Sequence, residues 1–246
     1  MGSEERLYSP KFYRQLDATR DSAREIVPII IDLLKMDSLK PASMIDVGCG
    51  PGHWLAAAAE LGVRDVLGVD GEWVLKTQLA IPREKFVEHD LRTPLKLGRK
   101  FDVALALEVA EHLPQSRAQA FVETLCELAD RVVFSAAIPG QGGRNHVNER
   151  WPSYWAELFR GCGYECYDVL RPRIWNNPRV LWYYAQNCLI FGDSGVLVHL
   201  GTPAQPLSLV HPGLWSARVT QMNSPGKLLE RLPKALLSRL KRQPGK

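Results

Sequence analysis

One glycine-rich segment near residue 50 constrains the fold more than any other part of the chain. A short apolar run, Met44–Val47, is followed by glycines at alternate positions, Gly48, Gly50 and Gly52, and then by alanine-rich, helix-compatible residues at 53–61. Glycine allows a positive φ and leaves no Cβ in the way of a close neighbour. The first turn of a helix offers free backbone N–H groups to an anion. The segment therefore predicts a strand, a tight turn and a helix that begins beside a phosphate or a carboxylate.

Three interpretations fit this turn. A dinucleotide-binding turn has the pattern G-x-G-x-x-G/A, but its third small residue would fall at position 53, which is His53. The observed pattern is G-x-G-x-G, with the acidic residue Asp46 two positions before the first glycine. The third interpretation is a tight turn that binds no ligand, because glycine-rich turns are common.

Apolar runs alternate with helix-like segments through the middle of the chain. After the first strand, further strands are predicted at 65–69, 86–91, 101–107, 130–137, 163–169 and 182–191. The run at 101–107 is almost continuously apolar, which is typical of a strand covered on both faces. This alternation predicts an α/β fold with helices on both sides of a doubly wound, mostly parallel sheet.

The second predicted strand ends at Asp70 and Gly71. Ligands of open α/β sheets bind at the carboxyl ends of the strands, and an acidic residue about 20 positions after the glycine turn accepts hydrogen bonds from ribose hydroxyls. Asp70 is therefore a candidate ribose ligand. The alternative is an exposed turn aspartate before a glycine.

These features together resemble the class I S-adenosylmethionine-dependent methyltransferases. The resemblance rests on the glycine turn with Asp46, on Asp70, and on the string E-V-A-E-H at 108–112, and it covers about residues 44 to 191. It implies a Rossmann-like sheet of seven strands whose last strand is antiparallel. It also implies S-adenosyl-L-methionine as the cofactor.

The resemblance assigns further cofactor contacts. Asp90 would bind the exocyclic amine of adenine with Leu91 beside the ring, and Glu108 would line the methionine part. The expected cofactor-binding residues are Asp46, Gly48, Gly50, Gly52, Asp70, Gly71, Asp90, Leu91 and Glu108. The implied domains are a helical lid at 1–40, a methyltransferase domain at 41–192 and a C-terminal extension at 193–246.

A glycine-rich loop at 138–143 precedes the best candidates for catalysis. The imidazole of His146 could accept the proton of a hydroxyl acceptor, Glu149 could orient that imidazole, and His112 is a third candidate. The alternative is that His146 fastens the loop through hydrogen bonds and that His112 caps or packs. A metal site is not expected, because an isolated H-x-x-E lacks the rest of a ligand set.

The positive charge of the chain is concentrated at its end. The net charge is +4, whereas residues 225–246 carry seven Lys or Arg and one Glu, a net charge of +6. Leucines repeat there at helical spacing, so the tail predicts a basic amphipathic helix that contacts an anionic membrane or a protein. A docked terminal helix is the alternative. Nucleic acid is not an expected partner, since basic residues do not cluster with aromatic ones near the presumed cofactor face.

The cysteines and the N-terminus bear on the compartment. Five cysteines without C-x-x-C spacing favour a reducing environment. The chain has no run of 18 apolar residues, and its N-terminus is charged rather than signal-like. We therefore expect a cytoplasmic protein.

The expected function is methyl transfer from S-adenosylmethionine to a hydroxyl of a small molecule, a sugar or a secondary metabolite. The segment N-H-V-N-E at 145–149 resembles an unassigned bacterial group of small methyltransferases, often seen with glycan or natural-product pathways. Three alternatives remain: methylation of a small-molecule amine, a cofactor-binding scaffold without catalysis, and a nicotinamide-dependent oxidoreductase.

Overall fold

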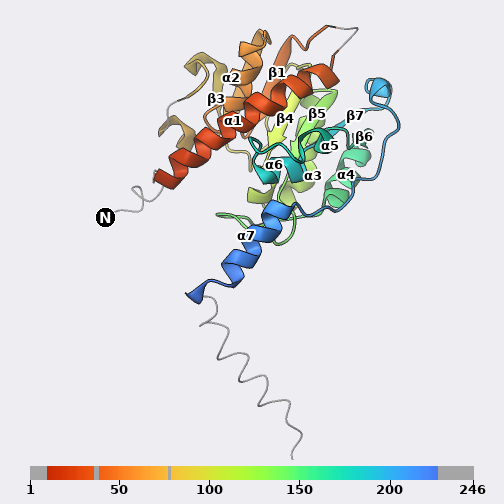
Figure 1. Cartoon of the computed structure of the whole chain (residues 1–246). Helices are drawn as coiled ribbons and strands as arrows, with labels where there is room; N and C mark the ends of the chain where they lie inside the picture. The colour runs from red at the N-terminus through yellow and green to blue at the C-terminus, as the bar shows by residue number, and fades with distance from the viewer. Residues whose placement is uncertain (1–9, 36–38, 77–78, 227–246) are drawn as a thin grey trace, which may run out of the picture. The chain divides into compact units, whose positions relative to one another are not determined.

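A twisted sheet organises the computed structural model, which describes residues 10–35, 39–76 and 79–226 (Figure 1). Within these residues the sheet has seven strands in the order β3-β2-β1-β4-β5-β7-β6. The chain separates into two compact units, Met1–Leu209 and Val210–Lys246. The sheet lies entirely in the first unit.

The strands confirm the predicted topology. Their bounds are β1 Ser43–Val47, β2 Asp65–Asp70, β3 Phe86–Glu88, β4 Val103–Leu107, β5 Arg131–Ser135, β6 Tyr164–Tyr167 and β7 Leu189–Asp193. Strands β1 to β5 pair in parallel, whereas β7 is antiparallel to both β5 and β6. The chain order reverses beside β1, where β2 and β4 flank it, and such a switch point is where open α/β sheets bind ligands.

Helices cover both faces of the sheet. The α-helices of the first unit are α1 Pro10–Leu33, α2 His53–Glu60, α3 Ala118–Leu128, α4 Pro152–Gly161, α5 Arg171–Ile174 and α6 Trp182–Asn187. Short 3₁₀ turns lie at Glu72–Lys76, Arg83–Lys85, Ala110–His112, Gln115–Arg117 and Val198–Leu200.

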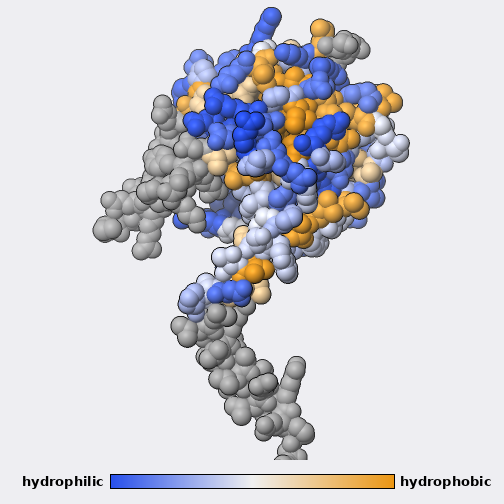
Figure 2. All heavy atoms as spheres, viewed as in Figure 1, coloured by the Kyte–Doolittle hydropathy of each residue, from blue (hydrophilic) through white to orange (hydrophobic). Residues whose placement is uncertain are grey.

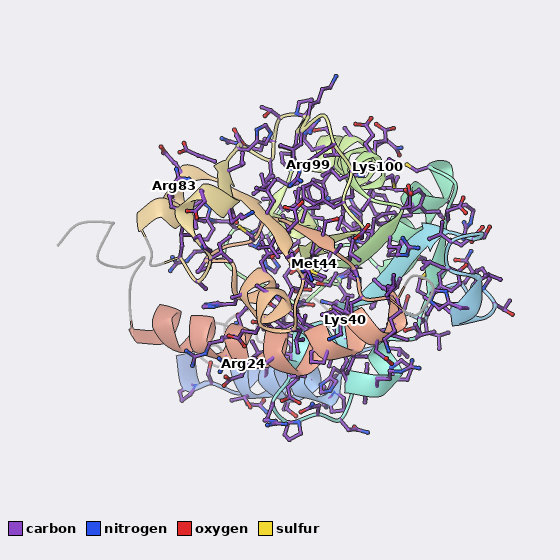
Figure 3. All side chains as sticks on the ribbon, turned by 90° about the horizontal axis from the view of Figure 1, so that it is seen from above. Arg24, Lys40, Met44, Arg83, Arg99 and Lys100 are labelled. Atoms are coloured by element: carbon purple, nitrogen blue, oxygen red, sulfur yellow. The ribbon has the colours of Figure 1, made fainter. Side chains whose placement is uncertain are left out.

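Two hydrophobic clusters hold these layers together. One is built from residues of α1, α2, α5 and α6, and the other from residues of α3 and α4. Met44 and Ile45 are consecutive in β1 and both fully buried, yet Met44 belongs to the first cluster and Ile45 to the second. Successive side chains of a strand point to opposite faces. In Figure 3 Met44 lies in the interior of the first unit, whereas the labelled Arg83 lies nearer the edge of that unit.

The prediction of a single strand over 182–191 is wrong in its first half. Trp182–Asn187 forms helix α6, and only Leu189–Asp193 forms strand β7. Aromatic residues favour strands in isolation, but here the ring of Tyr184 packs edge-on against Trp54 of α2, with centroids 4.9 Å apart. Tertiary packing therefore overrides local propensity at this position.

Two other boundaries differ from expectation by more than two residues. The helical pattern in the sequence begins near Asp21, whereas helix α1 begins at Pro10 and contains Pro28 in its interior. The third strand ends at Glu88 rather than at residue 91. As a consequence, Asp90 and Leu91 lie in the turn that follows the strand.

The second unit contributes helix α7, Pro212–Met222. Its N-terminus is capped by the ring of His211, which accepts a hydrogen bond from the Gly213 N–H, 3.0 Å away. Exposed apolar side chains, Trp215, Val219 and Met222, follow one another along it, and orange atoms are visible on this helix in Figure 2. The basic tail expected over 225–246 lies beyond residue 226 for nearly its whole length, outside the described residues. Among the helices that are described, none is both long and apolar enough to cross a bilayer.

Candidate active site

The glycine turn adopts the backbone that its sequence predicts. Gly48, Gly50 and Gly52 all have positive φ angles, of 91°, 51° and 89°. Two of them also lie against neighbours: a Cβ on Gly48 would be 2.3 Å from Val109 Cγ2, and one on Gly52 would be 2.9 Å from Ile81 Cγ1. Helix α2 begins directly after Gly52. Conformation and packing therefore both require glycine here.

Asp70 connects the turn to the end of β2. Its Oδ2 accepts a hydrogen bond from the Gly50 N–H at 2.8 Å, and its Oδ1 accepts from the Gly71 N–H at 2.7 Å and from Trp73 Nε1 at 3.0 Å. Burial raises the pKa of Asp70, and these hydrogen bonds oppose the rise. The carboxylate is thus held beside the glycine turn, and its role as a ribose ligand stays a prediction.

Asp46 lies under the same turn. It is 1% exposed, and its Oδ2 has no hydrogen-bond partner. Burial, and secondarily the negative charge of Asp70, raise the pKa of Asp46 well above its usual value. A buried oxygen without a partner beside the glycine turn is the feature that a bound polar ligand would complete.

The contacts of Asp90 and Leu91 do not test their predicted role at the adenine ring. The Asp90 carboxylate is exposed and accepts hydrogen bonds from Nε and Nη2 of Arg92, the latter at 2.8 Å, and these bonds lower the pKa of Asp90 to about 2. Leu91 is half-buried beside the second hydrophobic cluster. The adenine contact expected of this pair stays a prediction.

Glu108, at the end of β4, belongs to a polar network that the sequence interpretation missed. Its Oε2 accepts from Gln141 Nε2 at 2.7 Å, and its Oε1 accepts from Asn187 Nδ2 at 2.9 Å. Gln141 Oε1 in turn accepts from Gln186 Nε2 and from Asn187 Nδ2. The available signal was a pair of amides, Gln186 and Asn187, inside an otherwise aromatic and apolar segment.

The loop after β5 returns to this network and carries the predicted catalytic residues. The Glu111 carbonyl accepts hydrogen bonds from the N–H groups of Val147 and Asn148, at 2.8 and 3.1 Å. The Arg150 N–H bonds the Ala137 carbonyl just after β5. The rings of His112 and His146 meet edge to face with centroids 4.8 Å apart. Two histidines predicted separately are therefore neighbours.

The predicted pairing of His146 with Glu149 is present. His146 Nδ1 lies 2.9 Å from Glu149 Oε1. The same carboxylate accepts the N–H groups of Gly140, at 2.8 Å, and of Gly142. Glu149 therefore fastens the glycine-rich loop and orients the imidazole at once, so the two sequence-based interpretations of this segment are compatible.

Backbone strain gathers at the same place. The non-glycine residues with a positive φ, within the part of the chain that the structure describes, are Glu108 at 57° and Asn145 at 60°. One begins the segment that carries His112, and the other precedes His146. Such conformations cost about 1–3 kcal/mol and persist where the surroundings determine them, often at functional sites.

A hollow at another part of the first unit does not share this character. It is lined by residues 95–100 with Glu127 and Leu128. Two of its three cations, Arg99 and Lys100, labelled in Figure 3, are ion-paired with Asp65 and Asp130 at 2.6 and 2.7 Å. These pairs satisfy most of its positive charge, so the hollow lacks the unpaired buried groups of the switch point.

The switch point beside β1 therefore presents features that suit a polar ligand: Gly50 has open space beside it, Asp70 borders the turn and Asp46 lacks a partner beneath it. Combined with an antiparallel seventh strand, this geometry defines the class I S-adenosylmethionine-dependent methyltransferases. Residues 18–176 match the model of the family described as "Methyltransferase domain". The chain belongs to this family, which confirms the predicted enzyme class and, with it, S-adenosylmethionine as the methyl donor.

The individual relatives either have low sequence identity or match only a short stretch of the chain. A stretch of 31 residues is 58% identical to Ribosomal RNA large subunit methyltransferase E of Caulobacter sp. (strain K31), and the match covers 13% of this chain and 14% of that protein. SAM-bound CalS10, an amino pentose methyltransferase from Micromonospora echinaspora involved in calicheamicin biosynthesis, is 17% identical with a TM-score of 0.55, over 76% of this chain and 98% of that one. Streptomyces venezuelae DesVI is 21% identical with a TM-score of 0.45, over 58% and 61%. The chain thus spans less than two thirds of DesVI and a small part of the curated relative.

Proposed function

We propose that the chain methylates a hydroxyl group of a small molecule, with a sugar or a secondary metabolite as the favoured acceptor. The observation that carries this proposal is the His146–Glu149 pair. A hydroxyl is a weak nucleophile until a base takes its proton, and an oriented imidazole is suited to that task. An uncharged amine needs no such help, which makes amine methylation the second choice.

The fit of the cofactor rests on residues already described. S-adenosylmethionine supplies a methyl group on a positively charged sulfur, so it arrives activated for transfer. Asp70 would accept the ribose hydroxyls, and the glycine turn would admit the nucleoside close to the backbone. Glu108 would lie at the methionine part. Val109 packs against Gly48, so the cofactor side of the site contacts the segment that carries His112.

Three side chains would form the acceptor side of the site. His146 accepts the hydroxyl proton, Glu149 holds the imidazole in place, and His112 borders the acceptor. One general base contributes roughly 10²- to 10⁴-fold to a rate. The name of CalS10, an amino pentose methyltransferase, agrees with a sugar-like acceptor.

The experiment is an acceptor screen that detects S-adenosylhomocysteine. Once an acceptor is found, His146→Ala should lower turnover by roughly 10²- to 10⁴-fold while S-adenosylmethionine affinity, measured by calorimetry, stays nearly constant. His199→Gln is the matched control, since His199 lies elsewhere and bonds the Leu33 carbonyl. Full activity of His146→Ala at neutral pH would remove the base role. Cofactor binding without turnover on any acceptor would favour the scaffold alternative.

We also propose that residues 1–40 form a lid over the cofactor, before a methyltransferase domain at 41–192 and an extension at 193–246. Support comes from the attachment of α1 to the loop before α6. Glu25 bonds Asn177 and Arg179, each at 2.8 Å, and Ser22 Oγ accepts the Leu181 N–H. Helix α1 also packs on α2, which begins at the glycine turn. Limited proteolysis should cut residues 1–40 more slowly when S-adenosylhomocysteine is bound; equal rates would contradict the lid.

A further inference from the structure

Glu111 carries a fully buried carboxylate. Its exposed fraction is 0%, and neither Oε1 nor Oε2 accepts a hydrogen bond of normal geometry within the described residues. The neighbouring acidic side chain is that of Glu108, whose carboxyl lies close enough to share a proton with it. An uncompensated buried charge is costly, so such a group takes either a proton or a cation.

Two imidazoles converge on this carboxylate. Glu111, His112 and His146 each offer one ligand atom, and these atoms all lie within 4.8 Å of one another. His146 Nδ1 already contacts Glu149, which leaves Nε2 for a ligand. A metal-binding histidine usually has its other ring nitrogen bonded to a carboxylate or a carbonyl, and Glu149 provides that arrangement. It is itself fixed by the N–H groups of Gly140 and Gly142.

We propose that Glu111, His112 and His146 bind one divalent first-row transition-metal ion. Two imidazole nitrogens and one carboxylate favour such ions over Mg²⁺ or Ca²⁺, which prefer oxygen ligands. Three protein ligands leave positions open, as in catalytic metal sites. The expectation of no metal considered only His146 and Glu149, which lie three positions apart in the sequence. The fold adds Glu111 and His112 and makes Glu149 a supporting residue.

The chemical role of this ion rests on the proposed function, although its binding does not. A cation beside the acceptor hydroxyl lowers the pKa of that hydroxyl. The proton then leaves to solvent, and the oxygen forms a bond to the methyl carbon. The carbon–sulfur bond breaks, and its electron pair stays on the sulfur. In the loaded site His146 is a ligand, and in the metal-free site it is the base.

Cobalt binding tests the proposal without any acceptor. Chelator-treated full-length protein is titrated with Co²⁺ and followed by visible absorption and calorimetry. We expect one equivalent to bind through nitrogen and oxygen ligands. Thiolate-to-cobalt charge-transfer bands would instead indicate adventitious binding to a cysteine and would overturn the assignment.

Variants identify the ligands. Glu111→Gln and His146→Ala should each weaken Co²⁺ binding by at least the roughly 10- to 100-fold that loss of an outer-shell partner costs, and His199→Gln should not. Gly143→Ala keeps all three ligands, but its Cβ would lie 2.1 Å from His146 Nε2, so it should also weaken binding. Gly161→Ala, where an added Cβ meets nothing within 4 Å, is its control.

The outcomes separate this proposal from the proposed function. Unchanged Co²⁺ affinity in Glu111→Gln and Gly143→Ala, or no binding by the wild type, would overturn the metal site, and a proton on Glu111 would then explain its burial. Full turnover of chelator-treated protein would leave hydroxyl methylation with His146 as base and remove the ion's chemical role. Site-specific Co²⁺ binding without turnover on any hydroxyl would support the metal site and sink the acceptor assignment.

Discussion

The buried carboxylate of Asp46 destabilises the ligand-free protein, and a bound polar ligand that supplied a hydrogen bond would remove this cost. Its Oδ2 is buried without a partner, and leaving such an atom unsatisfied costs about 1–3 kcal/mol. Burial raises its pKa in the folded state, so the folded chain holds this proton more tightly than the unfolded chain does. The stability that the group contributes is therefore lost as pH rises above the unfolded pKa of about 3.9.

Asp46→Asn should accordingly stabilise the ligand-free protein at pH 7 and weaken its binding of S-adenosylhomocysteine. A gain of about 1 kcal/mol would raise the melting temperature by roughly 2–4 °C. The gain should shrink as the pH falls below the unfolded pKa of about 3.9, because the wild-type carboxyl then becomes protonated in both states. Thermal melts across this range measure it. A variant that is less stable at pH 7 would show that the ionised carboxylate is well accommodated.

Asp70 differs from Asp46 because its oxygens are already held by three N–H groups. Asp70→Ala should weaken S-adenosylmethionine binding by about tenfold or more, since a ribose hydroxyl bonded to a charged partner is worth about 1.5–3 kcal/mol. Asp193→Ala is the matched control, because Asp193 also accepts the N–H of a nearby turn glycine, Gly195. Calorimetry decides, and unchanged affinity in Asp70→Ala would remove the ribose assignment.

At the scale of elements, a glycine can be required either by a positive φ or by the lack of space for a Cβ, and two glycines of this chain distinguish these reasons. Gly48 and Gly62 have similar φ angles, 91° and 96°, but an added Cβ meets Val109 at Gly48 and nothing within 4 Å at Gly62. Both alanine variants should lose roughly 1–2 kcal/mol of stability, because the left-handed conformation is unfavourable for a residue with a Cβ. Gly48→Ala should lose more, because its Cβ would also displace the segment after β4.

Gly48→Ala should therefore be less stable than Gly62→Ala in urea unfolding, and only Gly48→Ala should lose cofactor affinity. Adding Val109→Ala to Gly48→Ala should recover part of the difference, because it removes the atoms that clash. Equal free energies of unfolding for the two single variants would mean that the turn shifts freely. The close approach of Val109 to the turn would then contribute neither to stability nor to cofactor binding.

The elements also show how far the sequence could be used. The glycine turn, the parallel strands and Asp70 depend on local rules, since a positive φ, an apolar run and an acidic strand end are visible in the residues themselves. The pairing of His146 with Glu149 spans three residues, so the sequence suggested it as a hypothesis, but only the fold shows the contact. Helix α6 was not, because its conformation depends on Trp54 and Glu108, which are far away in sequence. Nothing in the string E-V-A-E-H indicates that Glu111 is buried, and only the fold shows that its side chain is fully enclosed.

At the scale of the whole molecule, chemistry and charge occupy different parts of the chain. The residues proposed for the cofactor, the acceptor and the metal ion all belong to the unit Met1–Leu209. The excess positive charge lies in residues 225–246, within the unit Val210–Lys246. Leu207 still belongs with the first unit, because its carbonyl accepts a hydrogen bond from Arg171 Nη1 at 3.0 Å.

A chain that ends at Leu209 should therefore fold and bind S-adenosylmethionine like the full chain. It keeps the bond between Arg171 and Leu207 and every strand of the sheet. The melting temperature should change by less than about 2–4 °C, the shift that 1 kcal/mol produces at this size. Ending the chain at Pro206 removes Leu207 and leaves Arg171, which is 1% exposed, with one acceptor fewer, so this second truncation should be less stable. Sedimentation of both proteins with anionic vesicles tests the tail at the same time: binding should require residues beyond Leu209, and binding by the truncated chains would place the membrane contact on the first unit.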